Sequence, residues 1–383
     1  MSLPPQGGWQ HPQQPGPPPN QGRPHAQQFN PPGYPPPPPG WQQGNWPQSP
    51  GPPPQNRNSL KWLLIAVAVL LVIGISVGAT LIFTRSGGGS HETKPRSEAP
   101  SDIASANDTG PVSIITEEPT CEKFIGINNS LADVQANGWG AQRGSLGTAS
   151  QWTSDQRAQV AEVVKATQNA ADQMVALARQ TPNRVVRELY EQFIAYGRAY
   201  ADSIPTYAPA DDGLASANVN ASSALVGICN AITFGSANRS LVVDPAPAPR
   251  GVVKPGDPSD PQRFISTTSQ ACTSFQQLSD KFNDDTSEWQ RLDPNIPATQ
   301  WTPEQSAIQQ AALPFLTAWA DDMLRVGQTS GNTVIEDFAA TSSVYLRAFV
   351  SAGSNYTSAD SWLSYVAVRI NQLVLGACRA AVG

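Results

Sequence analysis

One segment of this chain occurs twice, and this duplication limits the possible folds more than any other feature. The stretch from Trp152 to Cys229 returns as Trp301 to Cys378, at an offset of 149 positions. First-copy residues with an identical partner at this offset include Trp152, Thr153, Gln156, Asp172, Met174, Asn183, Val185, Tyr196, Arg198, Ala199, Tyr207, Gly227 and Cys229. After two one-residue shifts, the alignment also pairs Trp139 with Trp289 and Cys121 with Cys272. We therefore expect two homologous units of about 110 residues each.

The apolar residues of each unit recur at helical spacing, which predicts an all-α fold. Four helices of about 20 residues with short loops favour two tandem four-helix up-and-down bundles. Thr153 and Gln156 stand at the spacing of a capping box, and Thr302 and Gln305 repeat this arrangement, so a helix is expected to start at each pair. In the second unit we expect the first helix to begin earlier, at Asp260.

The four cysteines fall one at each end of each unit, which is the pattern of one disulfide per bundle. Four cysteines allow three pairings. Only the pairing of Cys121 with Cys229 and of Cys272 with Cys378 treats both units alike and closes each bundle on itself as an independent body. We predict this pairing, which stabilises each unit by about 4–5 kcal/mol in the chain-entropy model. Paired cysteines also indicate an oxidising compartment.

Composition divides the chain into six regions. Many of its 37 prolines lie near the N-terminus, where aliphatic residues are scarce, so this part cannot offset the entropy of folding. The expected regions are a disordered cytoplasmic tail rich in Pro, Gln and Gly (1–59), a transmembrane helix (60–83), a flexible stalk (84–118), the first helical repeat (119–234), a Pro-rich linker (235–258) and the second helical repeat (259–383).

An uncharged segment of 22 residues, from Trp62 to Phe83, precedes the first unit. As a helix it spans about 33 Å, enough to cross a bilayer, and it lies too far from the N-terminus for a cleaved signal peptide. The flanking charges do not decide its orientation, but disulfides form outside the cytoplasm. We therefore expect the N-terminus inside and the repeats outside the cell membrane. Gly74 and Gly78 form a GxxxG pair, which either packs two such helices together or reflects the general abundance of glycine in membrane helices.

Charge and residue types argue against several functions. The net charge is −6, yet residues 1–61 carry three basic and no acidic residues. The remainder is therefore acidic, which argues against a nucleic acid partner. All three histidines lie outside the repeats, and the repeats contain no P-loop, nucleophile-elbow or zinc-binding spacing. We expect no enzyme activity, no metal site and no cofactor. The remaining enzymatic alternative is a hydrolase that uses carboxylates alone.

Two pairs of matched residues are candidates for interaction. Trp139 and Trp289 precede the second helix of each unit. In a loop, their rings either stack on a sugar of a cell-wall polymer, anchor a protein partner, or fill the core under the loop. Arg198 and Arg347 recur on the third helix and either form structural ion pairs or bind an acidic group.

The layout resembles that of a group of envelope proteins. The chain combines a tail with the run Gly33-Tyr34-Pro35-Pro36-Pro37, a membrane helix and an Ala-rich exterior with paired cysteines. This is similar to uncharacterised Pro-rich single-pass envelope proteins of mycobacteria and related actinobacteria, and the resemblance implies a location in the cell envelope.

Together these features predict a non-enzymatic, membrane-anchored extracytoplasmic protein that binds or scaffolds another component. Its expected partners are the lipid bilayer through residues 60–83, an envelope protein or cell-wall polymer outside, and a cytoplasmic partner of the Pro-rich tail. The alternative is a single-pass receptor, in which the helical exterior binds a ligand and the tail recruits the cytoplasmic partner.

Overall fold

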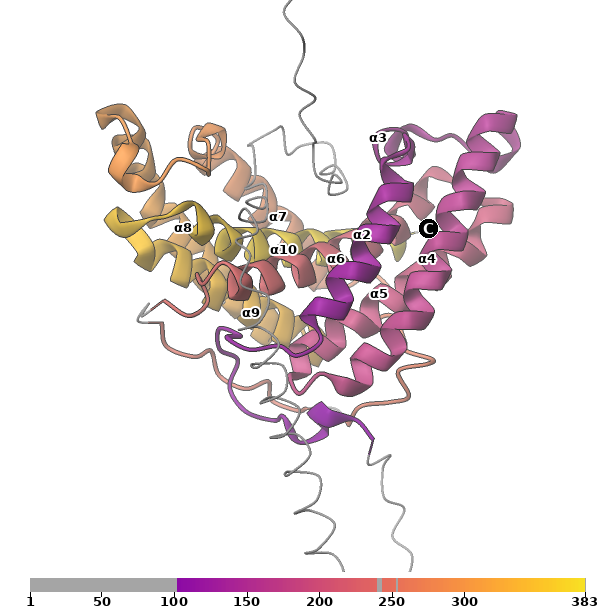
Figure 1. Cartoon of the computed structure of the whole chain (residues 1–383), viewed down its shortest axis with the longest axis horizontal. Coiled ribbons are helices and arrows are strands. Elements are labelled where there is room, and N and C mark those ends of the chain that lie inside the picture. Colours follow the sequence, from indigo (N-terminus) through magenta and orange to yellow (C-terminus); the bar gives the residue numbers. More distant parts are fainter. Residues whose placement is uncertain (1–101, 240–242, 253, 383) are drawn as a thin grey trace, which may run out of the picture. The chain divides into compact units, whose positions relative to one another are not determined.

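The computed structural model describes residues 102–239, 243–252 and 254–382, and over these residues it confirms the all-α class (Figure 1). The expected tail (1–59) and transmembrane helix (60–83), including Gly74 and Gly78, lie outside the described residues. Among the helices that are described, none is long and apolar enough to cross a bilayer.

The helices fall into two sets of corresponding length. The first set consists of α2 (Cys121–Ala136), the short α3 (Trp139–Gln142), α4 (Ser154–Gln180), α5 (Arg184–Ser203) and α6 (Asp212–Thr233). The second set consists of α7 (Gln270–Asp285), α8 (Pro303–Thr329), α9 (Thr333–Ala352) and α10 (Ser361–Ala380). Single 3₁₀ turns are η1 (Ala104–Asn107), η2 (Arg143–Ser145), η3 (Ala149–Gln151), η4 (Ile204–Thr206), η5 (Pro209–Asp211), η6 (Trp289–Arg291), η7 (Ala298–Gln300), η8 (Gly353–Asn355) and η9 (Ser358–Asp360).

The longest helix of each set begins at the predicted capping box. The Thr153 hydroxyl accepts from the Gln156 backbone N–H at 3.2 Å, and the Gln156 side chain accepts from the Thr153 N–H at 2.9 Å. Thr302 and Gln305 form the same two bonds at the same distances. Two otherwise unpaired backbone donors are satisfied at each start. As a result, α4 and α8 are both 27 residues long.

The disulfide pairing is the predicted one. Cys121 is bonded to Cys229, so the first helix of repeat 1 is joined to the end of α6. Cys272 is bonded to Cys378 and joins α7 to the end of α10 in the same way. The sequence separations are 108 and 106 residues, so the two bridges close loops of nearly equal length.

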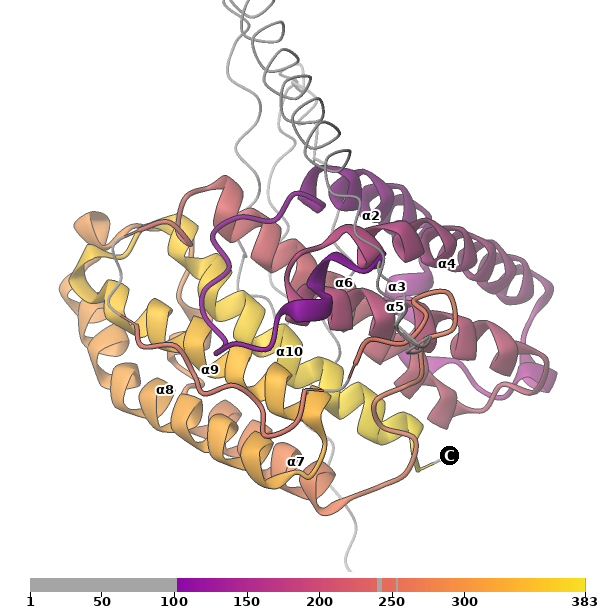
Figure 2. The same ribbon diagram turned by 90° about the horizontal axis from the view of Figure 1, so that it is seen from below.

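The expectation of two independently closed bundles is not met, because the most extensive helix contact joins α6 of one repeat to α10 of the other (Figures 1 and 2). Both helices are buried along almost their whole length. They run antiparallel, since a Cβ added at Gly376 would lie 2.7 Å from the backbone nitrogen of Ala217, and one at Gly227 would lie 2.7 Å from Val366. The 149-residue offset converts one close approach into the other, because Gly376 corresponds to Gly227 and Ala217 to Val366. The two helices are therefore related as in a pseudo-twofold pair. Small residues on α6 leave a surface that another helix has to cover, so the two repeats share one core.

Residues 102–118, expected to be the end of a flexible stalk, instead pack onto the repeats. Ile103, Val112 and Ile115 are buried, and the Ile115 N–H donates to the hydroxyl of Tyr345 in repeat 2. Val112 forms an isolated antiparallel bridge with Ala246 of the Pro-rich linker. The apolar residues of this segment explain the difference, because they cover the line where the repeats meet.

The early start of the first helix in repeat 2 is also wrong. Residue Asp260 lies in a turn, and α7 begins at Gln270. Phe264, expected on the helix, instead places its ring against Tyr196 of repeat 1 and Phe338 of repeat 2, with centroids 6.0 and 5.3 Å apart. The preceding segment is therefore used as a bridge between repeats, which requires an extended chain.

Candidate functional site

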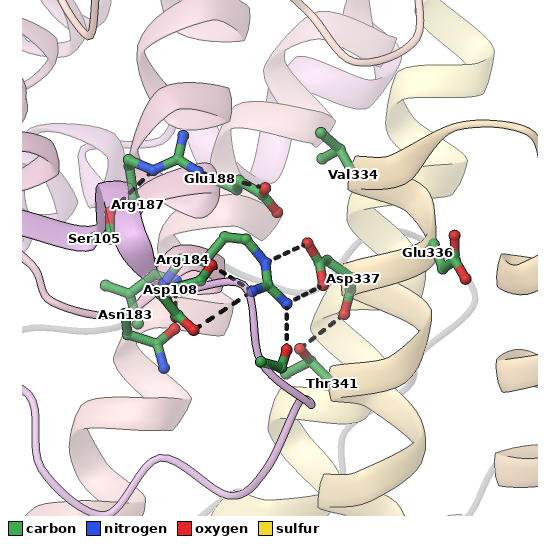
Figure 3. A network of polar contacts seen from close by, with 12 residues as sticks. Ser105, Asp108, Asn183, Arg184, Arg187, Glu188, Val334, Glu336, Asp337 and Thr341 are labelled. Atoms are coloured by element: carbon green, nitrogen blue, oxygen red, sulfur yellow. Dashed lines mark hydrogen bonds and ion pairs between the residues drawn. The ribbon is translucent and has the colours of Figure 1, made fainter. Parts of the chain in front are cut away.

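Arg184 is the centre of a buried polar network between the repeats (Figure 3). It is the first residue of α5, and its guanidinium forms a two-bond contact with Asp337 of α9, at 2.8 Å from Nε and 2.9 Å from Nη2. The side chains of Arg184 and Asp337 are 2% and 1% exposed. A planar guanidinium fork that meets a carboxylate in this way fixes both distance and orientation. The contact therefore sets how α5 sits on α9.

The N-terminal segment completes the surroundings of Arg184. Its Nη1 donates to the backbone carbonyl of Asp108 at 2.6 Å, and its Nη2 donates to the carbonyl of Gly110 at 3.1 Å. The Asp108 carboxylate accepts from the backbone N–H of Arg184 at 2.7 Å, at the start of α5. A carboxylate at the N-terminus of a helix also interacts favourably with the helix dipole. The guanidinium thus ties three parts of the chain together.

Electrostatics follow from the burial of this pair. Burial acts to lower the pKa of Arg184, but the hydrogen bonds and charge of Asp337, together with the charges of Asp108 and Glu188, outweigh burial, and the pKa is raised. Burial raises the pKa of Asp337, and the bonds from Arg184 oppose that rise. Removing either partner alone would leave a buried charge, which is far more costly than replacing both.

A second arginine lies one turn further along α5. Arg187 donates from Nε to Ser105 at 3.0 Å and from Nη1 to both oxygens of Glu191, also at 3.0 Å. Its contact with neighbouring Glu188 is looser, at 3.6 Å. Arg187 therefore anchors the N-terminal segment to α5 and is largely engaged by partners other than Glu188.

The exposed face of α8 carries an apolar row. Its members, named here the α8 stripe, are Ala307, Ala311, Pro314, Phe315 and Ala318. Phe315 is 43% exposed, and Val382 near the C-terminus is the other large hydrophobic residue exposed among the described residues. A small hollow between α7 and α8 adjoins Phe315, and its lining also includes Leu278, Phe282 and Trp319. An apolar row next to a hollow is a surface that a partner can cover.

Charged side chains edge the α8 stripe in ordered pairs. Lys281 pairs with Asp285, and Arg325 pairs with Asp322. The Lys281 ammonium also lies 5.9 Å from the centre of the Phe315 ring. The two cations are 60% and 66% exposed, whereas their carboxylate partners are 28% and 32% exposed. In each of these two pairs the cation is therefore the more exposed partner.

The matching face of α4 in repeat 1 is polar. At the 149-residue offset, Ala311, Pro314, Phe315 and Ala318 correspond to Glu162, Lys165, Ala166 and Asn169. Repeat 1 instead has an open groove of about 750 Å³ between α2 and α4. The groove exists because Gly126 and Ala176 line it, where repeat 2 has the larger Gln277 and Arg325. The two repeats therefore present different surfaces on the same helices.

The predicted tryptophan candidates lie in the aromatic clusters under the α2–α4 and α7–α8 connections. Trp139 is 2% exposed, opens the short helix α3 instead of standing in a loop, and donates its N–H to the hydroxyl of Tyr200 at 3.2 Å. Trp289 is partly buried and donates to Gln309 at 2.8 Å. Of the alternatives, burial favours the core-filling role for Trp139, because no ring face is free to stack on a ligand.

The predicted arginine candidates form matched ion pairs. Arg198 contacts Asp172 at 2.9 Å, and Arg347 contacts Asp321 at 2.6 Å. Each pair joins the second helix of a repeat to the third at the same offset. The arginine side chains are about one-third exposed, whereas Asp172 and Asp321 are 72% and 58% exposed. The short contacts at matched positions support the structural ion-pair alternative.

Sequence patterns missed Arg184, Asp337 and Phe315. The repeat comparison carried a usable sign for two of them, because Arg184 and Phe315 stand where the other copy has Thr333 and Ala166, residues of different character. Asp337 corresponds to Glu188, another carboxylic acid, so the comparison gave no sign for it. Among the described residues, no group of three or more His, Cys, Asp or Glu side chains is placed to hold a metal ion.

The described residues thus define an all-helical protein with two disulfides and an exposed apolar row on α8. A family model for the mycobacterial ESX-1 associated protein matches residues 103–382, and the chain belongs to this family. It is similar to an uncharacterized protein of Mycolicibacterium smegmatis (strain MKD8), with 41% identity over 334 residues, covering 85% of this chain and 88% of that protein. No solved structure matches significantly. The mycobacterial part of the expected resemblance is therefore confirmed.

Proposed function

We propose that this protein is a non-enzymatic, membrane-anchored protein of the mycobacterial envelope that binds or scaffolds a component of the ESX-1 system outside the cytoplasmic membrane. The family supports the link to ESX-1. Two disulfides support an oxidising location, and the uncharged segment 62–83 supports the anchor.

The observation that carries the binding role is the α8 stripe. Phe315 is 43% exposed, whereas the Ile, Leu, Val, Trp and Met side chains of the same helix are buried or partly buried. Leaving an aromatic ring partly exposed to water loses part of the free energy of its full burial, which is about 1.5–3 kcal/mol. The polar face of α4 shows that the same helical frame accommodates charged residues at these positions. The apolar face of α8 is therefore not required by the fold.

The shape and charge of this face specify a partner class. An apolar row at spacings of three and four residues along one helix matches an amphipathic helix lying beside it. Because Lys281 and Arg325 are more exposed than the carboxylates that they pair with, carboxylates flanking the partner's apolar row would complement them. The proposed ligand is thus an amphipathic helix with acidic edges, contributed by an ESX-1 component.

Site-specific photo-crosslinking tests this function. A photoreactive amino acid is placed at position 315 of the full-length protein in mycobacterial cells with and without an intact ESX-1 system. The matched control carries it at Ala166, the corresponding position of repeat 1. We expect a protein adduct from position 315 in the intact strain alone, and none from position 166. An adduct that persists without ESX-1, or equal adducts from both positions, would argue against the proposal.

The receptor alternative is favoured by the groove between α2 and α4. Filling it with Gly126→Gln and Ala176→Arg copies the residues of repeat 2. In the receptor alternative this change abolishes recruitment of a cytoplasmic partner by the tail, whereas in the scaffold proposal the crosslink from position 315 is retained and the tail is not needed for it.

A further inference from the structure

The pseudo-symmetry of the repeats leaves one buried carboxyl group, that of Glu188, with only a long ion pair, in which the Nη2 atom of Arg187 lies 3.6 Å from its Oε1. Glu188 and Asp337 occupy corresponding positions, but their partners differ. Asp337 has the Arg184 fork, whereas the residue of repeat 2 that corresponds to Arg184 is Thr333, which carries no charge. Glu188 is 7% exposed, and its Oε2 has no hydrogen-bond partner.

We propose that Glu188 is a proton-binding site that couples the two repeats: its carboxylate takes up one proton from water, and this tightens the contact between α5 and α9. In the step, an O–H bond forms on Glu188 while one O–H bond of a hydronium ion in the solvent breaks and releases a water molecule, and one negative charge disappears beside Asp337. The repeats are then held together more firmly at mildly acidic than at neutral pH. This inference does not depend on the proposed ESX-1 function.

The charges around Glu188 come from three parts of the chain. Arg184, Arg187 and Glu191 lie on its own helix, Asp337 lies on α9, and Asp108 of the N-terminal segment faces Asp337. In this cluster of described residues two arginines are therefore the only cations among four carboxylates. Arg184 is engaged by Asp337 and Asp108, and Arg187 by Glu191 and Ser105. A proton on Glu188 reduces this excess of negative charge without moving a side chain.

The expected direction of the pH dependence follows from the same surroundings. Burial, followed by the charge of Asp337, raises the pKa of Glu188 well above its ordinary value, and Arg187 opposes this only in part. A carboxyl group with a raised folded-state pKa contributes stability that is fully present below its unfolded-state pKa. That stability is lost as pH rises through the folded-state pKa. Between these two values, the folding equilibrium weakens by up to about tenfold per pH unit. Burial also raises the pKa values of Glu191 and Asp337, so they act in the same direction.

Hydrogen exchange of the full-length protein in detergent micelles tests the proposal. Exchange in peptides from α5 and α9 is compared at neutral and mildly acidic pH, after correction for the intrinsic pH dependence of exchange. We expect protection to rise by about tenfold or more on acidification. Glu188→Gln should show high protection at both pH values and lose most of the change. Glu162→Gln, which alters an exposed carboxylate on α4, should behave as the wild type.

Three outcomes would overturn the proposal. They are an unchanged protection of α5 and α9 on acidification, a pH response in Glu188→Gln equal to that of the wild type, and a loss of protection in that variant at both pH values. If Glu188→Gln does not fold, infrared titration of the wild-type protein decides. A buried carboxylic acid band that disappears well above the ordinary glutamate pKa supports the proposal, and its absence contradicts it.

Discussion

Both repeats place a tryptophan between the first and second long helices, but its N–H is satisfied differently in each. In repeat 1 it donates to Tyr200, and the position that corresponds to Gln309 is Val160. In repeat 2 it donates to Gln309, and Phe349 stands where Tyr200 would be. Each copy has one polar and one apolar residue at the two positions, in opposite order. The need to pair a buried N–H is shared, while the group that pairs it has changed.

The same comparison extends to the surfaces and the interface. The helix starts, the disulfides and the ion pairs between helices correspond in the two repeats. These features hold the helices of each repeat in place, and we call them the shared frame. Arg184 and Thr333 differ, as do Phe315 and Ala166. These differences lie at the repeat interface and on the exposed face of α8. The comparison teaches that a shared frame leaves such positions free to diverge, and that function is best sought where the copies disagree.

The largest expected effect comes from removing one disulfide. Replacing Cys121 and Cys229 together by Ser should lower the free energy of unfolding by about 4–5 kcal/mol, from the entropy of the 108-residue loop. Because α6 is packed along α10, we expect α10 to lose hydrogen-exchange protection together with α6. The matched control replaces Cys272 and Cys378 and should give nearly the same loss, since its loop is 106 residues. Loss confined to repeat 1 would show that the repeats are independent after all.

The next effect separates the two corresponding carboxyl groups. Asp337→Asn removes the charge that faces the Arg184 guanidinium and should cost about 3 kcal/mol at neutral pH, because a buried charge is left without its partner. Glu188→Gln, the corresponding change in repeat 1, should be neutral or stabilising there, since the pKa of Glu188 is already raised. Urea unfolding of both variants measures the difference. Equal losses would mean that Arg184 does not distinguish the two positions.

Features set by local sequence could be predicted, and features set by packing could not. The capping boxes require only residues three positions apart, and the disulfide pairing follows from the repeat, so both agree with the structure. The burial of α6 against α10 depends on which of several small-residue faces finds a partner, and spacing alone does not tell this. The buried place of residues 102–118 likewise follows from the gap that the repeats leave.

The candidate surface shows the same limit. Phe315 lies in an apolar run that, on sequence alone, reads as core, and its 43% exposure appears only once α7 and α9 are placed beside α8. Trp139 stands between two glycines and suggested a loop, but Gly138 takes a positive φ of 97° and turns the chain so that the ring enters the core. A glycine can signal a turn without telling where the next side chain points.

The smallest expected effect exchanges the two ways of pairing the tryptophan N–H. Burial raises the pKa of Tyr200 to about 12, so its hydroxyl stays neutral and remains an acceptor. Tyr200→Phe should cost about 1–3 kcal/mol, because the buried Trp139 N–H loses its acceptor. Adding Val160→Gln copies repeat 2 and should restore part of this loss.

The reverse exchange in repeat 2 decides between the two arrangements. Gln309 satisfies Trp289 with its oxygen, but its own Nε2 is buried without a hydrogen-bond partner. Replacing Gln309 by Val and Phe349 by Tyr removes that unpaired donor while supplying a hydroxyl acceptor, so we expect a gain of about 1 kcal/mol. Thermal or urea unfolding of the single and double variants measures the coupling between the positions. The stability change of the double variant is compared with the sum of the changes in the two single variants. If the two are equal, the hydroxyl does not reach Trp289, and the repeats differ in packing as well as in polar partners.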